Sequence, residues 1–223
     1  MTAVLLDIGG VILPEDELYA RLFQSTKAAL RNAGVHVSDE EFDDAVRKCI
    51  ASFVPGLREA LIWHFTKPDM GKFAAVVSAA KWDEGPRDPR PGIRELLEEF
   101  SASCTLALAA NASGAIRSVL AEHDLLRYFK SVEVSGDLPF AKPDPRFFEH
   151  ILRNCGVGPE EAIMIGDRLD NDIIPAKLLG MKTILYKTGP YAILEPRTPD
   201  EIPDVAVTSV DDLRAALLKF LAA

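Results

Sequence analysis

The sequence predicts an α/β protein in which a parallel sheet is interrupted by a helical insert. From Pro86 onward, short apolar runs alternate with amphipathic segments of helical period, the pattern of a parallel sheet with crossover helices. The stretch from about Pro14 to Gly85 differs, because it contains no convincing strand and is typical of three or four helices. We therefore expect a core formed by residues 1–13 and 86–223 and a helical insert formed by residues 14–85.

The strands of the core are predicted where apolar residues follow one another without interruption. Such runs are typical of strands that are buried on both faces of a parallel sheet. The predicted strands are Met1–Leu6, Thr105–Ala110, Ser131–Val134, Ala162–Ile165, Thr183–Tyr186 and Val205–Val207.

The helices of the core are placed by their terminal residues. Pro91 is expected to begin one helix, Asp144 and Pro145 a second that ends at Gly156, and residues 211–221 form the last. The first two helices each carry an apolar face, made of Ile93, Leu96, Leu97 and Phe100 in one and of Phe147, Phe148, Ile151 and Leu152 in the other. In the insert, Ser38 and Glu41 have the spacing of a capping box, and Gly34 ends the preceding helix.

Composition excludes several classes of protein. Among 223 residues, 48% are hydrophobic and 26% charged, which is typical of a globular rather than a disordered chain. A net charge of −9 argues against a general nucleic-acid binder, which needs a basic surface. A phosphorylated small substrate remains compatible with this charge, because a divalent ion and a lysine can neutralise a phosphate locally.

The same composition predicts a cytoplasmic location. Cys49, Cys104 and Cys155 form no close pair and no metal-type spacing, which favours buried free thiols in a reducing compartment. The apolar N-terminus reaches Asp7 too soon for a signal peptide, and no apolar run approaches the ~20 residues that span a bilayer. We expect no membrane partner, and the sequence leaves the oligomeric state open.

Four polar features follow predicted strands. Asp7 follows the first, Asn111 the second, Lys142 comes after the third, and Asp167 and Asp172 follow the fourth. Ligands of open α/β sheets gather beyond the carboxyl ends of the strands. Acidic side chains brought together there would repel one another without a cation, and a site rich in carboxylate oxygens suits Mg²⁺. A bound Mg²⁺ would polarise a phosphoryl group and leave Asp7 able to attack it, while Lys142 balances the charge.

Each feature alone also has a simpler interpretation. A single Asp after a strand is usually a turn residue or a helix cap, and a single Lys is usually solvated. Gly166 and Asp167 could simply begin the next helix, with Asp170 or Asn171 as its cap. The occurrence of all the features in this order, each at a strand end, favours the catalytic interpretation.

These residues resemble four known motifs. Asp7-Ile8-Gly9-Gly10-Val11-Ile12, Asn111, Ala141-Lys142-Pro143-Asp144-Pro145 and Gly166-Asp167-Arg168-Leu169-Asp170-Asn171-Asp172 are similar to the motifs of the haloacid dehalogenase superfamily. The insert resembles the α-helical cap of the phosphatase and phosphoglucomutase branch. The resemblance implies a Rossmann-like parallel-sheet core with an inserted α-helical cap, and a hydrolase that forms an aspartyl-phosphate intermediate with Mg²⁺ as cofactor.

The resemblance also implies a role for each residue. Asp7 would be the nucleophile and Lys142 the second catalytic residue, which holds both the phosphate and the nucleophile. The implied metal ligands are Asp7, the backbone carbonyl of Gly9, Asp167 and Asp172. The implied phosphate-binding residues are Asn111, Ala112 and Lys142.

Two positions depart from the family pattern. Family phosphatases usually carry a second Asp, the general acid and base, two residues after the nucleophile, and here that residue is Gly9. Losing such a group typically costs about 10²–10⁴ in rate. The Ser or Thr that usually precedes the Asn of the second motif is Ala110 here. Ser113 lies nearby but is expected to cap the next helix, so backbone N–H groups around Asn111 and Ala112 would bind the phosphate.

These departures separate several functional hypotheses. The first is a slow or specialised phosphatase for a small phosphorylated metabolite with a good leaving group, and the second is a catalytically weak Mg²⁺- and phosphate-binding or regulatory protein. A phosphonatase would need a Schiff-base lysine from the cap, and the candidates are Lys27, Lys48, Lys67, Lys72 and Lys81. A haloacid dehalogenase needs no acid at Gly9, but Asp167 and Asp172 argue against it.

The cap could supply a substitute proton donor. Arg58, Trp63 and His64 are the cap residues of first interest, and His64 is attractive as the donor because a histidine pKa ordinarily lies near neutrality. The simpler expectation is that Trp63 and Phe65 pack within the cap while His64 faces solvent. Within the core, Arg168 is expected either to orient the metal-binding loop or to pair with an acidic neighbour.

Overall fold

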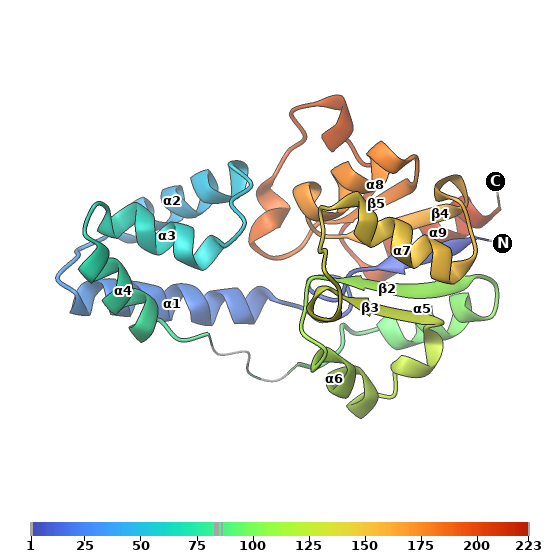
Figure 1. Ribbon diagram of the computed structural model, residues 1–223, viewed down its shortest axis with the longest axis horizontal. Coiled ribbons are helices and arrows are strands. Elements are labelled where there is room, and N and C mark those ends of the chain that lie inside the picture. Colours follow the sequence, from blue (N-terminus) through green and yellow to red (C-terminus); the bar gives the residue numbers. More distant parts are fainter. Residues whose placement is uncertain (1, 83–84, 86, 223) are drawn as a thin grey trace. The chain divides into compact units, whose positions relative to one another are not determined.

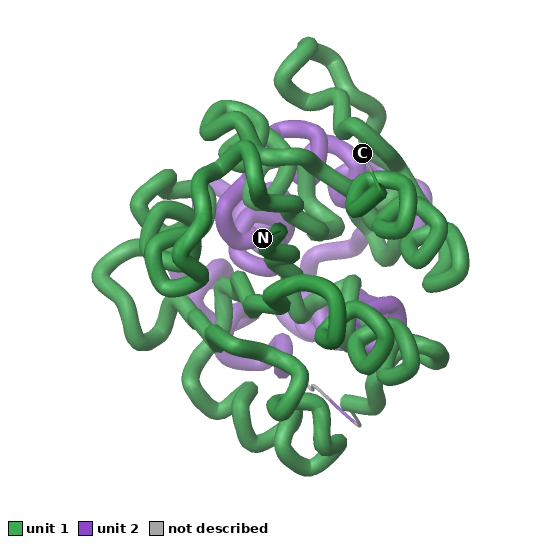
Figure 2. The backbone as a smooth tube through the Cα atoms, turned by 90° about the vertical axis from the view of Figure 1, so that its right-hand side faces the viewer, with its two compact units in different colours: residues 1–14, 87–223 green, residues 15–86 purple. Residues whose placement is uncertain are grey.

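The computed structural model describes residues 2–82, 85 and 87–222, and the chain divides into two compact units. Unit 1 comprises residues 1–14 and 87–223, and unit 2 comprises residues 15–86 (Figure 2). Each boundary lies one residue beyond the expected one. Met1, in the predicted first strand, and Pro86, at the expected return to the core, lie outside the described residues.

Unit 1 is built on a six-stranded parallel sheet with the strand order β3-β2-β1-β4-β5-β6 (Figure 1). Its strands are β1 (Ala3–Leu6), β2 (Thr105–Ala110), β3 (Ser131–Val134), β4 (Ala162–Gly166), β5 (Lys182–Tyr186) and β6 (Val205–Val207). The six predicted strands are all confirmed, with small differences at their ends. The α/β fold class is therefore confirmed as well.

The pairing of the central strands determines where the residues that follow them lie. Leu6 at the end of β1 pairs with Leu108 of β2 on one side and with Ile165 of β4 on the other. The Asp7 N–H donates to the Ile165 carbonyl at 2.9 Å, so the chain leaving β1 stays beside the end of β4. Residues that follow β1 and β4 consequently emerge side by side at the carboxyl edge.

Helices cover both faces of the sheet, and alternate residues of each strand point to opposite faces. Val4 and Leu6 of β1 belong to one apolar cluster with α5 (Ile93–Ser101), α6 (Ile116–Glu122) and α9 (Val210–Leu221). Ala3 and Leu5 belong to another with α7 (Pro145–Cys155) and α8 (Ile174–Leu179). This burial on both faces is why the strands consist of uninterrupted apolar runs.

The predicted helix ends are confirmed in one case and shifted in two. Asp144 caps α7 through a hydrogen bond from the Arg146 N–H, and α7 ends at Gly156 as expected. The last helix begins one residue early, because Ser209 is its cap. Pro91 does not begin α5: Gly92 has a φ of +81°, outside the helical region, so the helix begins at Ile93.

The described residues of unit 2 form helices joined by loops. The helices are α1 (Asp16–Asn32), α2 (Asp39–Ala51), α3 (Leu57–Thr66) and α4 (Met70–Ala79). The capping box of Ser38 and Glu41 is present at the start of α2. Phe42 of α2 stacks on Phe65 of α3 with ring centroids 5.9 Å apart. None of the helices in the described ranges combines the length and the hydropathy that crossing a membrane requires.

Candidate active site

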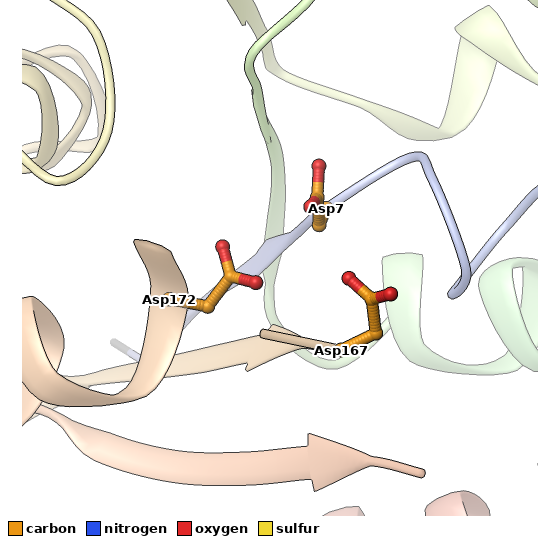
Figure 3. A group of neighbouring side chains, drawn as sticks. All are labelled: Asp7, Asp167 and Asp172. Carbon is orange, nitrogen blue, oxygen red and sulfur yellow. The ribbon is translucent and has the colours of Figure 1, made fainter. Parts of the chain in front are cut away.

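Three carboxylates meet at the carboxyl edge of the sheet in unit 1. Asp7 follows β1, Asp167 follows β4, and Asp172 lies in the π-helical turn Leu169–Ile173 (Figure 3). One oxygen of each carboxylate lies within 4.8 Å of the others. Asp167 and Asp172 are buried, with exposed fractions of 6% and 0%. The strand ends thus bring together the three side chains that the sequence predicted as metal ligands.

Lys142 completes this cluster. Its Nζ lies 2.9 Å from Asp7 Oδ2 and 2.6 Å from Asp172 Oδ1, and the side chain is buried. Three carboxylates and one ammonium leave a net charge of −2 in this group. Because a divalent cation would cancel this charge, and because carboxylate oxygens are the donors that Mg²⁺ prefers, the residues present fit a Mg²⁺ site.

Burial and mutual charge shift the protonation of this group. Burial raises the pKa of Asp172 to about 6 and the charge of Asp7 adds to the rise, although Lys142 opposes both. Burial acts to lower the pKa of Lys142, but Asp172 and Asp7 outweigh it and hold that pKa above its ordinary value. Lys142 is therefore cationic at neutral pH, as its predicted role requires.

Asn111 holds Lys142 in place through its backbone. The Asn111 Nδ2 donates to the Lys142 carbonyl at 2.8 Å, and the Lys142 N–H donates to Asn111 Oδ1 at 2.9 Å. Both ends of the carboxamide therefore bind the peptide groups of Lys142. Its predicted role in binding phosphate stays a prediction, and so does that of Ala112, whose carbonyl accepts from the Gly136 N–H at 3.0 Å.

Glycines let the backbone approach the carboxylates closely. A Cβ added at Gly10, where φ is +69°, would lie 2.6 Å from Asp167 Oδ2. A Cβ added at Gly166 would lie 2.2 Å from Asp172 Cγ. The carbonyl of Gly9 accepts from the Val11 N–H at 2.7 Å and retains a second lone pair for the implied metal. Sequence reasoning missed the roles of Gly10 and Gly166, although the Gly9-Gly10 pair shortly after Asp7 and the glycine directly before Asp167 were visible signals.

The Arg168 side chain pairs with an acidic neighbour, one of the two roles expected for it. Its guanidinium pairs with Asp170 at 2.6 Å and donates to the Tyr191 hydroxyl at 3.1 Å. Burial opposes its charge, but Asp170 holds the pKa of Arg168 above the ordinary value. The Arg168 backbone N–H donates to Asp172 Oδ2 at 3.1 Å, which orients that carboxylate.

The expectation that Ser113 caps a helix is wrong, and the simpler interpretation of Asp170 or Asn171 as a cap is not met either. Neither the turn Leu169–Ile173 nor α8 has a side-chain cap, so Asp170 and Asn171 do not play that role. Asp170 instead binds Arg168. Ser113 does not cap α6, because that helix begins later, with Ala115 as its cap residue.

The candidate residues of the cap are held within unit 2. Arg58 pairs with Glu59 at 2.8 Å and donates to the Ala80 carbonyl. Trp63 packs edge-on against Phe73 while 39% of it stays exposed, and His64 is exposed as expected. Two of the cap lysines form ion pairs, Lys27 with Asp39 at 2.7 Å and Lys48 with Asp44 at 2.6 Å.

The family assignment comes from a family model for haloacid dehalogenase-like hydrolases, which matches residues 1–180. The chain belongs to this family of hydrolases. A solved haloacid dehalogenase-type phosphatase from Thermococcus onnurineus superposes with a TM-score of 0.64 at 26% identity, covering 97% of this chain and 98% of that one.

Curated relatives match over shorter stretches. A glyceraldehyde 3-phosphate phosphatase of Methanopyrus kandleri is 41% identical over 80 residues, 36% of this chain and 34% of that protein. A phosphoserine phosphatase of Thermus thermophilus is 36% identical over 124 residues, 55% of this chain and 47% of that protein. These matches therefore span less than half the length of either relative.

Proposed function

We propose that this chain is a cytoplasmic, Mg²⁺-dependent phosphatase that removes phosphate from a small metabolite through a phosphoryl group carried by Asp7. The observation that carries the proposal is the position of Lys142, whose Nζ bridges Asp7 and Asp172 inside a cluster of three carboxylates. The named relatives, both phosphatases of small metabolites, support the same substrate class.

Each residue of the candidate site has a separate role in the proposed reaction. Asp7, Asp167, Asp172 and the Gly9 carbonyl would hold Mg²⁺, which when bound supplies positive charge to the phosphoryl oxygens. Asp7 attacks phosphorus with one carboxylate oxygen while the P–O bond to the leaving group breaks, and water then cleaves the bond between Asp7 and the phosphoryl group to release inorganic phosphate. Lys142, whose Nζ lies 2.9 Å from Asp7 Oδ2, stabilises the charge on the transferred group.

Gly9 restricts the leaving group. It has no side chain to protonate a departing alkoxide, so the barrier stays high where the leaving group is a poor one. The aryloxide of an aryl phosphate and the carboxylate of an acyl phosphate are weaker bases, so they leave without being protonated. We therefore expect kcat/KM, which reports the transfer of the phosphoryl group to Asp7, to fall in the order acyl, aryl and then alkyl phosphates.

The test is a Mg²⁺-dependent assay with acetyl phosphate, p-nitrophenyl phosphate, glyceraldehyde 3-phosphate and phosphoserine. Asp7→Asn should abolish turnover, whereas Asp200→Asn, an exposed control in the same unit, should leave it unchanged. Undiminished activity of Asp7→Asn would contradict the assignment of the nucleophile. If no phosphate is hydrolysed while Mg²⁺ and phosphate analogues still bind, the alternative of a binding or regulatory protein is favoured.

A further inference from the structure

Arg90 binds three consecutive carbonyls of the loop that follows Asp7. Its backbone N–H donates to the Ile12 carbonyl at 2.8 Å, and its Nε donates to the Val11 carbonyl at 3.2 Å. Its Nη2 donates to the carbonyl of Gly10. One residue close to the point where the chain re-enters unit 1 thus fixes most of this loop.

The guanidinium of Arg90 is itself anchored at the end of β5. It lies over the ring of Tyr186 at 4.6 Å from the centroid, and Nη2 donates to Thr188 Oγ1 at 3.1 Å. Tyr186 is buried, so its ring is held by the packing of the core. A planar fork that stacks on an aromatic ring while donating to carbonyls is a geometry that lysine does not reproduce.

The loop held by Arg90 touches the candidate metal site directly. The Gly10 Cα lies against the Asp167 side chain, so closely that no Cβ fits between them. The preceding residue, Gly9, offers the carbonyl implied as a metal ligand. A shift of the Gly10–Ile12 carbonyls would therefore move both Gly9 and the surroundings of Asp167.

We propose that Arg90 is a positioning residue that sets the Asp7 loop for metal binding and phosphoryl transfer. This inference rests on the proposed function for its catalytic readout but not for its metal-binding readout. Neighbours that orient metal ligands typically change metal affinity or activity by about 10–100-fold when they are replaced.

The experiment compares Arg90→Lys with Arg94→Lys in the full chain. Arg94 is a matched control, because it also donates to a backbone carbonyl, that of His123, away from the site. Three quantities are measured: the Mg²⁺ dissociation constant by calorimetry, hydrogen exchange at the Ile12 and Leu13 amides, and kcat and KM for p-nitrophenyl phosphate. Both amides donate to the Ile8 carbonyl, so they report the closure of the loop.

For Arg90→Lys we expect Mg²⁺ binding weaker by about tenfold, faster exchange of both amides, and kcat lower by about tenfold with KM little changed. Arg94→Lys should match the wild type in all three measurements. A purely structural role predicts a lower Tm with unchanged Mg²⁺ affinity and unchanged kcat per folded molecule, and that result would overturn the proposal.

Two further comparisons keep the outcome decisive. If Arg90→Lys does not fold, Thr188→Val removes one anchor of the guanidinium and should weaken Mg²⁺ binding and speed loop exchange to a smaller degree; wild-type values would overturn the proposal. If the wild type hydrolyses no phosphate, the proposed function fails, while Mg²⁺ affinity and amide exchange still decide the role of Arg90.

Discussion

At the scale of single residues, the positive charge of Lys142 favours phosphoryl transfer but opposes the binding of a cation. In the proposed mechanism the ammonium stabilises phosphoryl transfer, but it would also repel any cation held by Asp7 and Asp172, which lie within 2.9 Å of it. Metal affinity and turnover should therefore change in opposite directions when this charge is removed.

Lys142→Met tests this opposition. The substitution keeps an unbranched side chain of similar length but leaves three carboxylates uncompensated, so Mg²⁺ should bind more tightly while kcat falls by about 10²-fold or more. Calorimetry and steady-state kinetics measure the two effects. Lys219→Met, near the end of α9, is the control. A parallel loss of Mg²⁺ affinity and kcat would contradict the opposition.

Gly10→Ala tests the close approach of the loop to Asp167. An alanine at a φ of +69° costs about 1–2 kcal/mol in any location, and here its Cβ would also displace the Asp167 carboxylate. Gly156→Ala is a matched control, because Gly156 has a φ of +75° and no atom within 4 Å of an added Cβ. Both variants should lose stability in chemical denaturation, but only Gly10→Ala should lose Mg²⁺ affinity. Equal Mg²⁺ affinities would show that the contact is unimportant.

At the scale of elements, a short segment between β5 and β6 contains an ion pair between the buried Glu201 and the half-exposed Arg197. Glu201 is buried, and its Oε2 accepts a hydrogen bond from the Arg197 backbone N–H at 2.8 Å. The Nε of the Arg197 guanidinium lies 3.3 Å from the same oxygen. Burial acts to raise the pKa of Glu201, but the hydrogen bonds from Arg197 outweigh it and hold that pKa below its ordinary value.

The sign of this shift gives a pH dependence. Because the pKa in the folded state is below that in the unfolded state, the ionised carboxylate stabilises the fold above the unfolded pKa. The contribution is lost as pH falls through the folded pKa. Glu201→Gln should therefore be less stable than the wild type at neutral pH, and the difference should shrink in acid. A difference in unfolding free energy that stays constant with pH would contradict this origin.

The strands and some helix ends could be predicted from the sequence, whereas other helix ends could not. The strands were predictable because burial on both faces requires uninterrupted apolar residues, and α7 because Asp144 and Gly156 are strong local signals. The start of α5 was not, because a proline at position 91 predicts a helix start equally well whether or not the following glycine is left-handed.

At the scale of the whole molecule, the site is assembled from distant parts of the sequence. Asp7, Lys142, Asp167 and Asp172 were predictable, since each follows a strand and parallel strands end at one edge. The reciprocal hydrogen bonds of Asn111 and the binding of Arg90 to three carbonyls were not. They depend on side-chain geometry between segments that no local pattern connects.

Mg²⁺ should raise the stability of unit 1, because a ligand that binds only the folded state stabilises it by mass action. The gain is about 2.7 kcal/mol when Mg²⁺ is present at a hundred times its dissociation constant. Thermal unfolding with Mg²⁺ and with EDTA measures the effect. Asp167→Asn should remove most of the shift, and Asp200→Asn should retain it. A shift that persists in Asp167→Asn would place the cation elsewhere.

The central claim is that Asp7 carries the phosphoryl group, and Gly9 makes it directly testable. Without a base at position 9 to activate water, breakdown of the phosphorylated aspartate should be slow, and the intermediate should accumulate. The measurement is mass spectrometry of the protein acid-quenched during turnover of acetyl phosphate with Mg²⁺. We predict a phosphoryl group on the peptide that contains Asp7, lost in Asp7→Asn and without Mg²⁺. Phosphorylation of a different residue, or turnover with no phosphorylated protein, would contradict the account.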